Sequence, residues 1–283
     1  MKQQFLSITS TIVRIMPGWL KQGLYRLGPI SNLIRQTLNL LSPEGFSKVT
    51  IASGRAEGLV MDLDLKKEKD YWLGTYEPKL QEMIHRNVRE GWTAYDVGAN
   101  IGYFSLILAK TVGISGDVYA FEAMPGNVKR LKNNLVLNEV SSRVKVLPYA
   151  VINESKPVQF LPGPSGAMGK VEGSAGRHEG HRESFEVQGI SLDDFIADES
   201  NRPPNVIKMD IEGGEVLAIQ GMKKVLTEIR PLIFLEIHGS DAAKSVWAGL
   251  NEVGYQISEL KPGFPQVSSW EALDWKSYLT AIP

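Results

Sequence analysis

The chain has 283 residues, 43% of them hydrophobic, which is enough for one large α/β domain with an N-terminal extension or for two small domains. Its 31 Lys plus Arg and 32 Asp plus Glu give a net charge of -1, so nothing supports phosphate-driven binding and we expect no nucleic-acid partner. Because it contains no Cys, disulfides, a thiolate nucleophile and Cys-ligated metal are excluded.

The first 43 residues carry an excess of positive charge. Residues 1–43 hold five basic side chains and no acidic one, and apolar residues recur at helical spacing from Phe5 to Trp19. Three interpretations are open for this segment: peripheral membrane contact, docking of a partner, or a helical cap packed on the domain. No run reaches the roughly 18–20 apolar residues of a membrane span, and no signal-peptide cleavage site is clear, which predicts a cytoplasmic protein.

The residues that follow predict a small mixed region. Residues 46–65 contain two short runs of strand type around a glycine turn, and Pro78–Val88 predicts a helix. We therefore expect residues 1–75 to form a helical and short β extension and residues 76–283 to form the main domain.

From Thr93 onward, strand-like runs alternate with helix-like ones. The predicted strands are 93–97, 118–122, 144–151, 206–210, 232–237 and 255–260. The predicted helices are 104–110, 128–137, 216–229 and 242–253. This alternation is typical of an α/β fold with a Rossmann-like, mostly parallel, doubly wound sheet whose strand carboxyl ends share one rim. Residues 162–184, rich in glycine, interrupt the pattern and are either a surface insertion or a mobile flap over the substrate pocket.

A strand, a glycine turn and a helix follow one another around Asp96–Gly102. Gly98 lets the chain turn tightly, and Gly102 is expected to pack the helix against its strand. The spacing Asp-x-Gly-x-x-x-Gly differs from the glycine pattern that seats a pyrophosphate, and its acidic first residue suits a cationic ligand such as S-adenosylmethionine. An acid at the end of the second strand can accept both ribose hydroxyls. The predicted cofactor residues are Asp96, Gly98, Ala99, Asn100, Gly102 and Glu122.

The segment Val206–Glu215 repeats this pattern of strand, acid, glycine turn and helix. If the strand order reverses beside the first strand, Asp96 and Asp210 flank the same crevice, where open α/β sheets bind ligands. Asp210 and Glu212 are therefore site candidates, and Asp210 joins the predicted cofactor residues. Glu215 falls in the first helical turn, where a carboxylate stabilises the helix, so we expect it to be structural.

Several motifs, in this order along the chain, resemble those of FkbM-type methyltransferases. They are Asp96–Gly102, Phe121–Asn127, Leu131–Asn138, Ala150–Val151, Ser191–Asp193 and Asp210–Glu215. The resemblance runs from about Tyr76 to about Gly254. It implies a class I methyltransferase fold and S-adenosylmethionine-dependent O-methylation of a small-molecule or glycan hydroxyl. By the same resemblance Glu77 could close over the methionine part of the cofactor, although a carboxylate at a helix start is the simpler interpretation.

Methyl transfer to a hydroxyl is helped by a base that takes its proton. Of the four histidines only His238 ends an apolar strand, on the rim where Asp210 ends its own strand. Glu236 lies two residues earlier, on the same strand face, and would raise the pKa of His238. We predict that His238, or failing that Asp210 or Glu212, takes the proton. Alternatively, His238 caps the next helix.

Three other functions remain open. A nucleotide-dependent oxidoreductase would require the phosphate-type glycine spacing, which is absent. A non-catalytic subunit would hold the cofactor or a partner without turnover. A metal-assisted O-methyltransferase would use Asp210, Glu236 and His238, an acceptable ligand set. We predict no metal; the sequence identifies neither the acceptor nor the oligomeric state.

Overall fold

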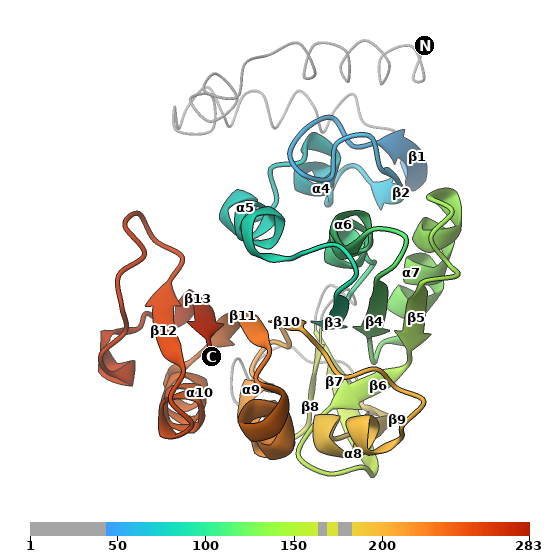
Figure 1. Ribbon diagram of the computed structural model, residues 1–283. Coiled ribbons are helices and arrows are strands. Elements are labelled where there is room, and N and C mark those ends of the chain that lie inside the picture. Colours follow the sequence, from blue (N-terminus) through green and yellow to red (C-terminus); the bar gives the residue numbers. More distant parts are fainter. Residues whose placement is uncertain (1–43, 164–168, 175–182) are drawn as a thin grey trace.

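The computed structural model describes residues 44–163, 169–174 and 183–283. Its centre is a seven-stranded sheet, seen edge on in Figure 1. In spatial order the strands are β12 (Gln256–Glu259), β13 (Lys276–Ile282), β11 (Leu232–His238), β10 (Val206–Met209), β3 (Thr93–Val97), β4 (Asp117–Phe121) and β5 (Val144–Leu147). From β11 to β5 all pairs are parallel, and β13 is antiparallel to both of its neighbours. The expected mostly parallel α/β sheet is confirmed.

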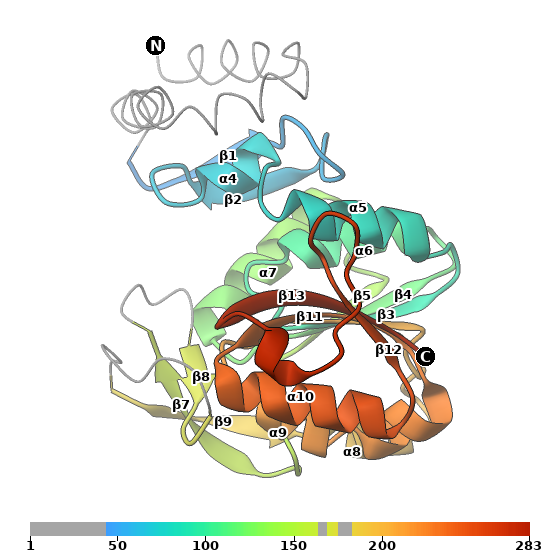
Figure 2. The same cartoon turned by 90° about the vertical axis from the view of Figure 1, so that its left-hand side faces the viewer.

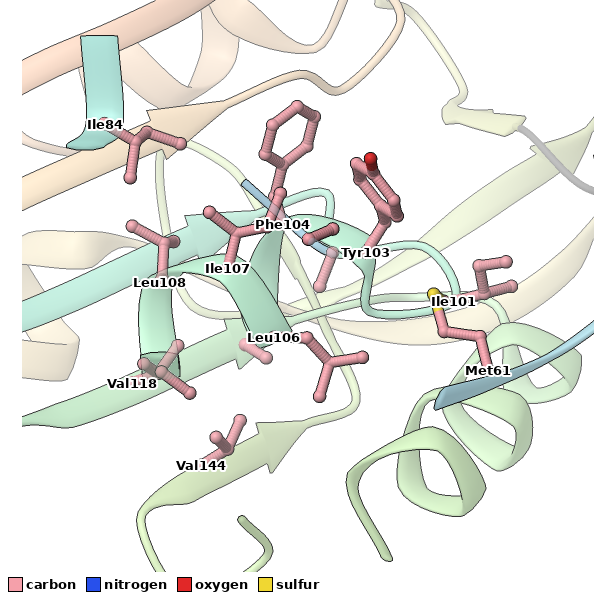
Figure 3. Packing of buried hydrophobic residues seen from close by; sticks show 14 of the residues in the cluster. Met61, Ile84, Ile101, Tyr103, Phe104, Leu106, Ile107, Leu108, Val118 and Val144 are labelled. Carbon is pink, nitrogen blue, oxygen red and sulfur yellow. The ribbon is translucent and has the colours of Figure 1, made fainter. Parts of the chain in front are cut away.

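Helices cover both faces of this sheet, as Figure 1 shows. One layer comprises α5 (Pro78–Asn87), α6 (Tyr103–Val112) and α7 (Pro125–Leu137). The other comprises α8 (Leu192–Ala197), α9 (Glu215–Gln220) and α10 (Ser240–Glu252). A separate cluster of buried apolar side chains fills each face, and Figure 3 shows the one around α6. Because helices cover both faces of the sheet, its central strands are buried along their whole length, and every residue of β3 is buried.

The described part of the N-terminal extension packs on the first helical layer. It contains the hairpin β1 (Phe46–Thr50) and β2 (Val60–Asp64), followed by the short helix α4 (Lys69–Leu73). Met61 and Trp72 join the same apolar cluster as Ile101 of the main domain. Asn134 Oδ1 on α7 accepts a hydrogen bond from the Asp62 N–H at 2.9 Å, which ties the hairpin to α7. Residues 1–43, where membrane or partner contact was considered, lie outside the described residues.

A second, four-stranded sheet lies beside the carboxyl ends of the central strands, at the lower left in Figure 2. Its spatial order is β6 (Tyr149–Val151), β9 (Phe185–Ile190), β7 (Pro157–Pro162) and β8 (Gly169–Val171). The single strand predicted for 144–151 is wrong, because Pro148 separates β5 of the central sheet from β6 of the second sheet. Proline has no N–H to donate to a neighbouring strand, so it ends the ladder.

Two further predictions differ from the structure. The helix predicted over 216–229 is broken after Gln220, and a π-helical turn, Val225–Ile229, follows. Gly221 packs against another segment so closely that a Cβ there would lie 2.1 Å from the Ile152 carbonyl oxygen. The strand β13 was not predicted, although it completes the sheet between β11 and β12. Within the described ranges, no helix combines the length and the apolar character needed to cross a bilayer.

Candidate functional site

The site lies where β3 and β10 stand side by side with parallel directions. The Asp210 N–H donates to the Val97 carbonyl at 3.0 Å, so the two strands end together and their following turns face each other. This is the point at which the strand order reverses, the usual ligand position in an open α/β sheet. A cavity of about 370 Å³ opens there, within the range of small-molecule sites. Asp96 and Asp210 therefore belong to neighbouring strand ends, as expected.

The glycine turn after β3 forms part of the cavity wall. Gly98, Ala99 and Asn100 all line the cavity, and Gly98 and Asn100 have positive φ angles of 78° and 50°. A Cβ on Gly98 would lie 1.8 Å from the backbone oxygen of Asp210. The neighbouring strand end therefore requires glycine at position 98.

Asp96 and Gly102 lie behind the cavity and are not among the residues that line it. The Asp96 carboxylate is fully buried, accepts a hydrogen bond from Ser105 Oγ at 2.5 Å, and lies 3.4 Å from Lys208 Nζ. The expected place of Asp96 against a cationic ligand is therefore taken by a cation of the protein itself. A Cβ on Gly102 would lie 2.4 Å from Leu131 Cδ1, so Gly102 allows the start of α6 to approach α7, not its own strand.

Glu122 follows β4 and lines the cavity on the other side of the glycine turn. Its two carboxylate oxygens accept hydrogen bonds from the Asn100 N–H at 2.7 Å and the Met124 N–H at 2.8 Å. Burial raises the pKa of Glu122, and these hydrogen bonds oppose that rise. Glu122 therefore fixes both loops that border this end of the cavity. Its contact with ribose hydroxyls remains a prediction.

Asp210 lines the cavity and Glu77 does not, and each has a carboxylate oxygen without a hydrogen-bond partner. Asp210 Oδ1 lines the cavity region after β10, and Glu77 Oε1 belongs to the residue just before α5, held at a φ of 44°. Burial raises the pKa of Asp210 to about 7, against the attraction of Lys208. Burial and repulsion by Asp210 raise the pKa of Glu77 to about 8. The two carboxyl groups thus titrate near neutral pH.

His238 is held by carboxylates through both ring nitrogens. Its Nε2 lies 2.7 Å from Glu236 Oε1, and its Nδ1 lies 3.3 Å from Glu215 Oε1. Burial disfavours the charged imidazole, but the hydrogen bonds with Glu215 and Glu236 outweigh it and raise the pKa of His238 to about 10. At neutral pH His238 is a cation with both N–H groups engaged. The structure therefore does not favour His238 as the group that takes the acceptor proton.

Asp210, Glu236 and His238, the set considered for a metal, do converge. One ligand-type atom from each lies within 4.8 Å of the others. Glu236 already interacts with protein cations, because His238 and Lys276 both contact its Oε1. Lys276 and the imidazolium lower the pKa of Glu236 to about 2, against the effect of burial. The metal-assisted alternative remains a prediction. The three side chains converge as a metal site would require, but His238 and Lys276 already place positive charge beside Glu236.

Several cavity residues were not identified from the sequence. Lys208 is buried and pairs with Asp96, and its position two residues before Asp210 on the same strand face was a usable signal. Other lining residues, among them Lys170, Trp275 and Lys276, come from outside the motifs. No local pattern marks them, because separate chain segments bring them to the cavity. His178 and His181 of the glycine-rich segment lie outside the described residues.

The sheet is mostly parallel, and a cavity lined by acidic residues and glycines opens where its strand order reverses. These features define a Rossmann-like domain of the methyltransferase type. The family model described as the methyltransferase FkbM domain matches residues 96–257, more than half of the chain. The chain therefore belongs to the FkbM methyltransferase family, and the resemblance stated from its motifs is confirmed. It is a methyltransferase.

Known relatives are similar over much of the chain. The hexuronic acid methyltransferase AglP of Haloferax volcanii is 29% identical over 176 residues, which cover 62% of this chain and 68% of that protein. The crystal structure of methyltransferase FkbM from Methylobacillus flagellatus is 19% identical with a TM-score of 0.45, covering 89% of this chain. This chain spans 59% of the length of that protein. A SAM-dependent O-methyltransferase from Thermotoga maritima is 14% identical with a TM-score of 0.42, covering 72% of this chain and 65% of that one.

Proposed function

We propose that this protein transfers a methyl group from S-adenosylmethionine to a hydroxyl of a sugar. One observation carries the proposal: a single cavity joins the glycine turn and Glu122 at one end to the side chains of Asp210, Glu236 and His238 at the other. Because β4 and β10 lie on opposite sides of β3, these two groups stand apart along the rim of the sheet. The cavity thus offers separate places for a cofactor and for an acceptor.

The residues at the glycine turn fit the cofactor. Glu122 accepts a hydrogen bond from the Asn100 N–H of the turn, and Asn100 Oδ1 is a buried oxygen without a partner in the protein. Such oxygens suit a ligand that brings hydroxyl, ammonium and sulfonium groups. Gly98, Ala99, Asn100 and Glu122 would hold the cofactor, with Asp96 and Gly102 supporting them from behind. When bound, S-adenosylmethionine supplies an electrophilic methyl group on a positively charged sulfur.

The chain's own residues must align the acceptor oxygen and remove its proton. Asp210 suits the second task, because its Oδ1 is free, it lines the cavity and its pKa is about 7. His238 instead holds Glu215 and Glu236 in place as a cation. The role first predicted for His238 therefore passes to Asp210, which was the stated alternative.

A sugar acceptor is supported by the relative whose printed name is hexuronic acid methyltransferase. The test has two parts. Mass spectrometry of small molecules that co-purify with the protein should find S-adenosylmethionine or S-adenosylhomocysteine. Labelled S-adenosylmethionine should then transfer its methyl group to uronic acid glycosides, and Asp210→Asn should abolish this transfer while binding of S-adenosylhomocysteine persists. Binding of NAD alone would support an oxidoreductase, and cofactor binding without transfer to any glycan would support a non-catalytic subunit.

A further inference from the structure

Trp275 exposes apolar surface at the mouth of the cavity. Its side chain is 46% exposed and lines the cavity. The other exposed large hydrophobic side chains of the described residues do not line it; they are Phe46, Ile114, Val136, Phe264 and Ile282. Apolar surface left in water is stabilised when a ligand covers it. An exposed indole in a cavity wall therefore indicates a contact surface for a ligand with an apolar face.

The position of Trp275 is fixed by the central sheet. The Gly239 N–H, just after β11, donates to the Trp275 carbonyl oxygen at 2.7 Å. The indole meets the His238 ring edge to face, with centroids 5.9 Å apart. The next residue, Lys276, pairs with His238 in the β11–β13 ladder. Trp275 is thus held beside the acceptor end of the cavity without any loop having to close.

Polar groups flank this indole on the same wall. Lys276 and Glu212 both line the cavity, with side chains 46% and 36% exposed. Three other basic side chains line the cavity but are almost fully buried: Lys170, Lys208 and His238. Among the described residues, Lys276 is therefore the cavity-lining cation that an entering anion can approach. Its ammonium contacts Glu236 and has three N–H donors, so it can bind a second partner.

We propose that Trp275, Lys276 and Glu212 form the acceptor subsite and that it takes an acidic pyranose. The apolar face of the sugar ring packs on the indole, the sugar carboxylate binds Lys276, and Glu212 accepts from ring hydroxyls. This inference rests on the proposed function and names the substrate class. Trp275 and Lys276 lie beyond residues 96–257, the part matched by the family model, so they would distinguish this acceptor from those of other family members.

The first experiment measures binding and not turnover. Methyl glucuronide and methyl glucoside are titrated into the full chain, observed by saturation-transfer NMR, with S-adenosylhomocysteine titrated separately by calorimetry. Trp275→Ala should weaken glucuronide binding about tenfold, the upper range for loss of one aromatic contact, and leave S-adenosylhomocysteine affinity unchanged. Trp275→Phe should retain part of the sugar affinity. Phe264→Ala is the matched control, because Phe264 is equally exposed, 46%, and lies away from the cavity.

The second experiment tests the charge contact. Lys276→Met should remove the preference for glucuronide over glucoside, and Lys261→Met, a 48% exposed lysine paired with Glu259 and Asp274, should not. Equal loss of both sugars in Lys276→Met, or unchanged sugar binding in Trp275→Ala, overturns the inference. A wild-type protein that binds S-adenosylhomocysteine but neither sugar overturns it while leaving cofactor use intact. Failure to bind S-adenosylhomocysteine, with sugar binding retained, counts against the proposed function alone.

Discussion

The ammonium of Lys208 donates to the carbonyl oxygen of Gly98 at 3.1 Å, and the same ammonium lies 3.4 Å from Asp96 Oδ1. One buried cation on β10 therefore holds both the strand end and the glycine turn of β3. Burial opposes its charge, but the attraction of Asp96 and Asp210 outweighs it and raises the pKa of Lys208. The glycine turn after β3 is thus shaped by the neighbouring strand as well as by its own glycines.

Lys208→Met should lower the free energy of unfolding by about 3–5 kcal/mol, because it leaves the buried Asp96 carboxylate without its counter-charge. Denaturant unfolding followed by circular dichroism measures the change. Adding Asp96→Asn to this variant removes the uncompensated charge and should restore part of the loss. A double variant no more stable than Lys208→Met would show that Asp96 and Lys208 are not energetically coupled.

Gly98→Ala should destabilise the protein by at least about 1–3 kcal/mol, the cost of a left-handed conformation at a non-glycine residue, and should weaken cofactor binding. The Cβ would also collide with the Asp210 carbonyl, so the turn must move. Thermal unfolding and calorimetry with S-adenosylhomocysteine measure the two effects. Gly126→Ala is the control, because nothing lies within 4 Å of its Cβ position and it is helical. Equal stability of the two variants would contradict the close approach of Gly98 and Asp210.

Turnover should depend on the ionisation of Asp210. With a pKa of about 7 for that carboxyl group, kcat should fall as the pH drops from about 8 to about 6, because only the carboxylate accepts a proton. His238→Gln removes a positive charge that lowers the pKa of Asp210. In this variant the fall of kcat at low pH should therefore begin at a higher pH, while the maximal kcat at high pH should be unchanged. The pH dependence of methyl transfer checks both statements. Abolished turnover at every pH in His238→Gln would return the role of base to His238.

Stability should decrease as the pH is raised above neutrality. The pKa of His238 rises from 6.5 to about 10 on folding, so its contribution is complete below pH 6.5 and is lost as the pH passes through 10. The pKa values of Asp210 and Glu77 are raised to about 7 and about 8, so each carboxyl group lowers the stability as the pH rises towards its folded pKa and adds no further loss above it. The urea concentration at the midpoint of unfolding should fall as the pH rises from about 6 to 10, and it should fall less steeply in His238→Gln. A midpoint that rises over this range would contradict these shifts.

A chelator should leave methyl transfer unchanged, because Lys276 and the His238 imidazolium already neutralise Glu236. Activity measured after dialysis against EDTA, with and without added Mg²⁺, provides the test. Loss of activity that Mg²⁺ restores would favour the metal-assisted alternative at Asp210, Glu236 and His238.

The fold class, most of the central strands and the glycine turn after β3 can be predicted from the sequence alone. Those features depend on local patterns: buried parallel strands are continuous apolar runs, and a tight turn between strand and helix requires glycine at a position such as Gly98. The division of 144–151 into β5 and β6, and the place of β13 in the sheet, depend on pairing between distant segments.

The contacts of the charged residues could not be predicted from the sequence. Asp96 was expected to face the ligand, but its partner Lys208 comes from a strand more than a hundred residues away. His238 was predicted to be a base, and the structure adds that Glu215 and Glu236 contact it from two sides and raise its pKa. The charge state of a buried group depends on every neighbour that burial brings near it, and those neighbours are set by the packing of the whole chain.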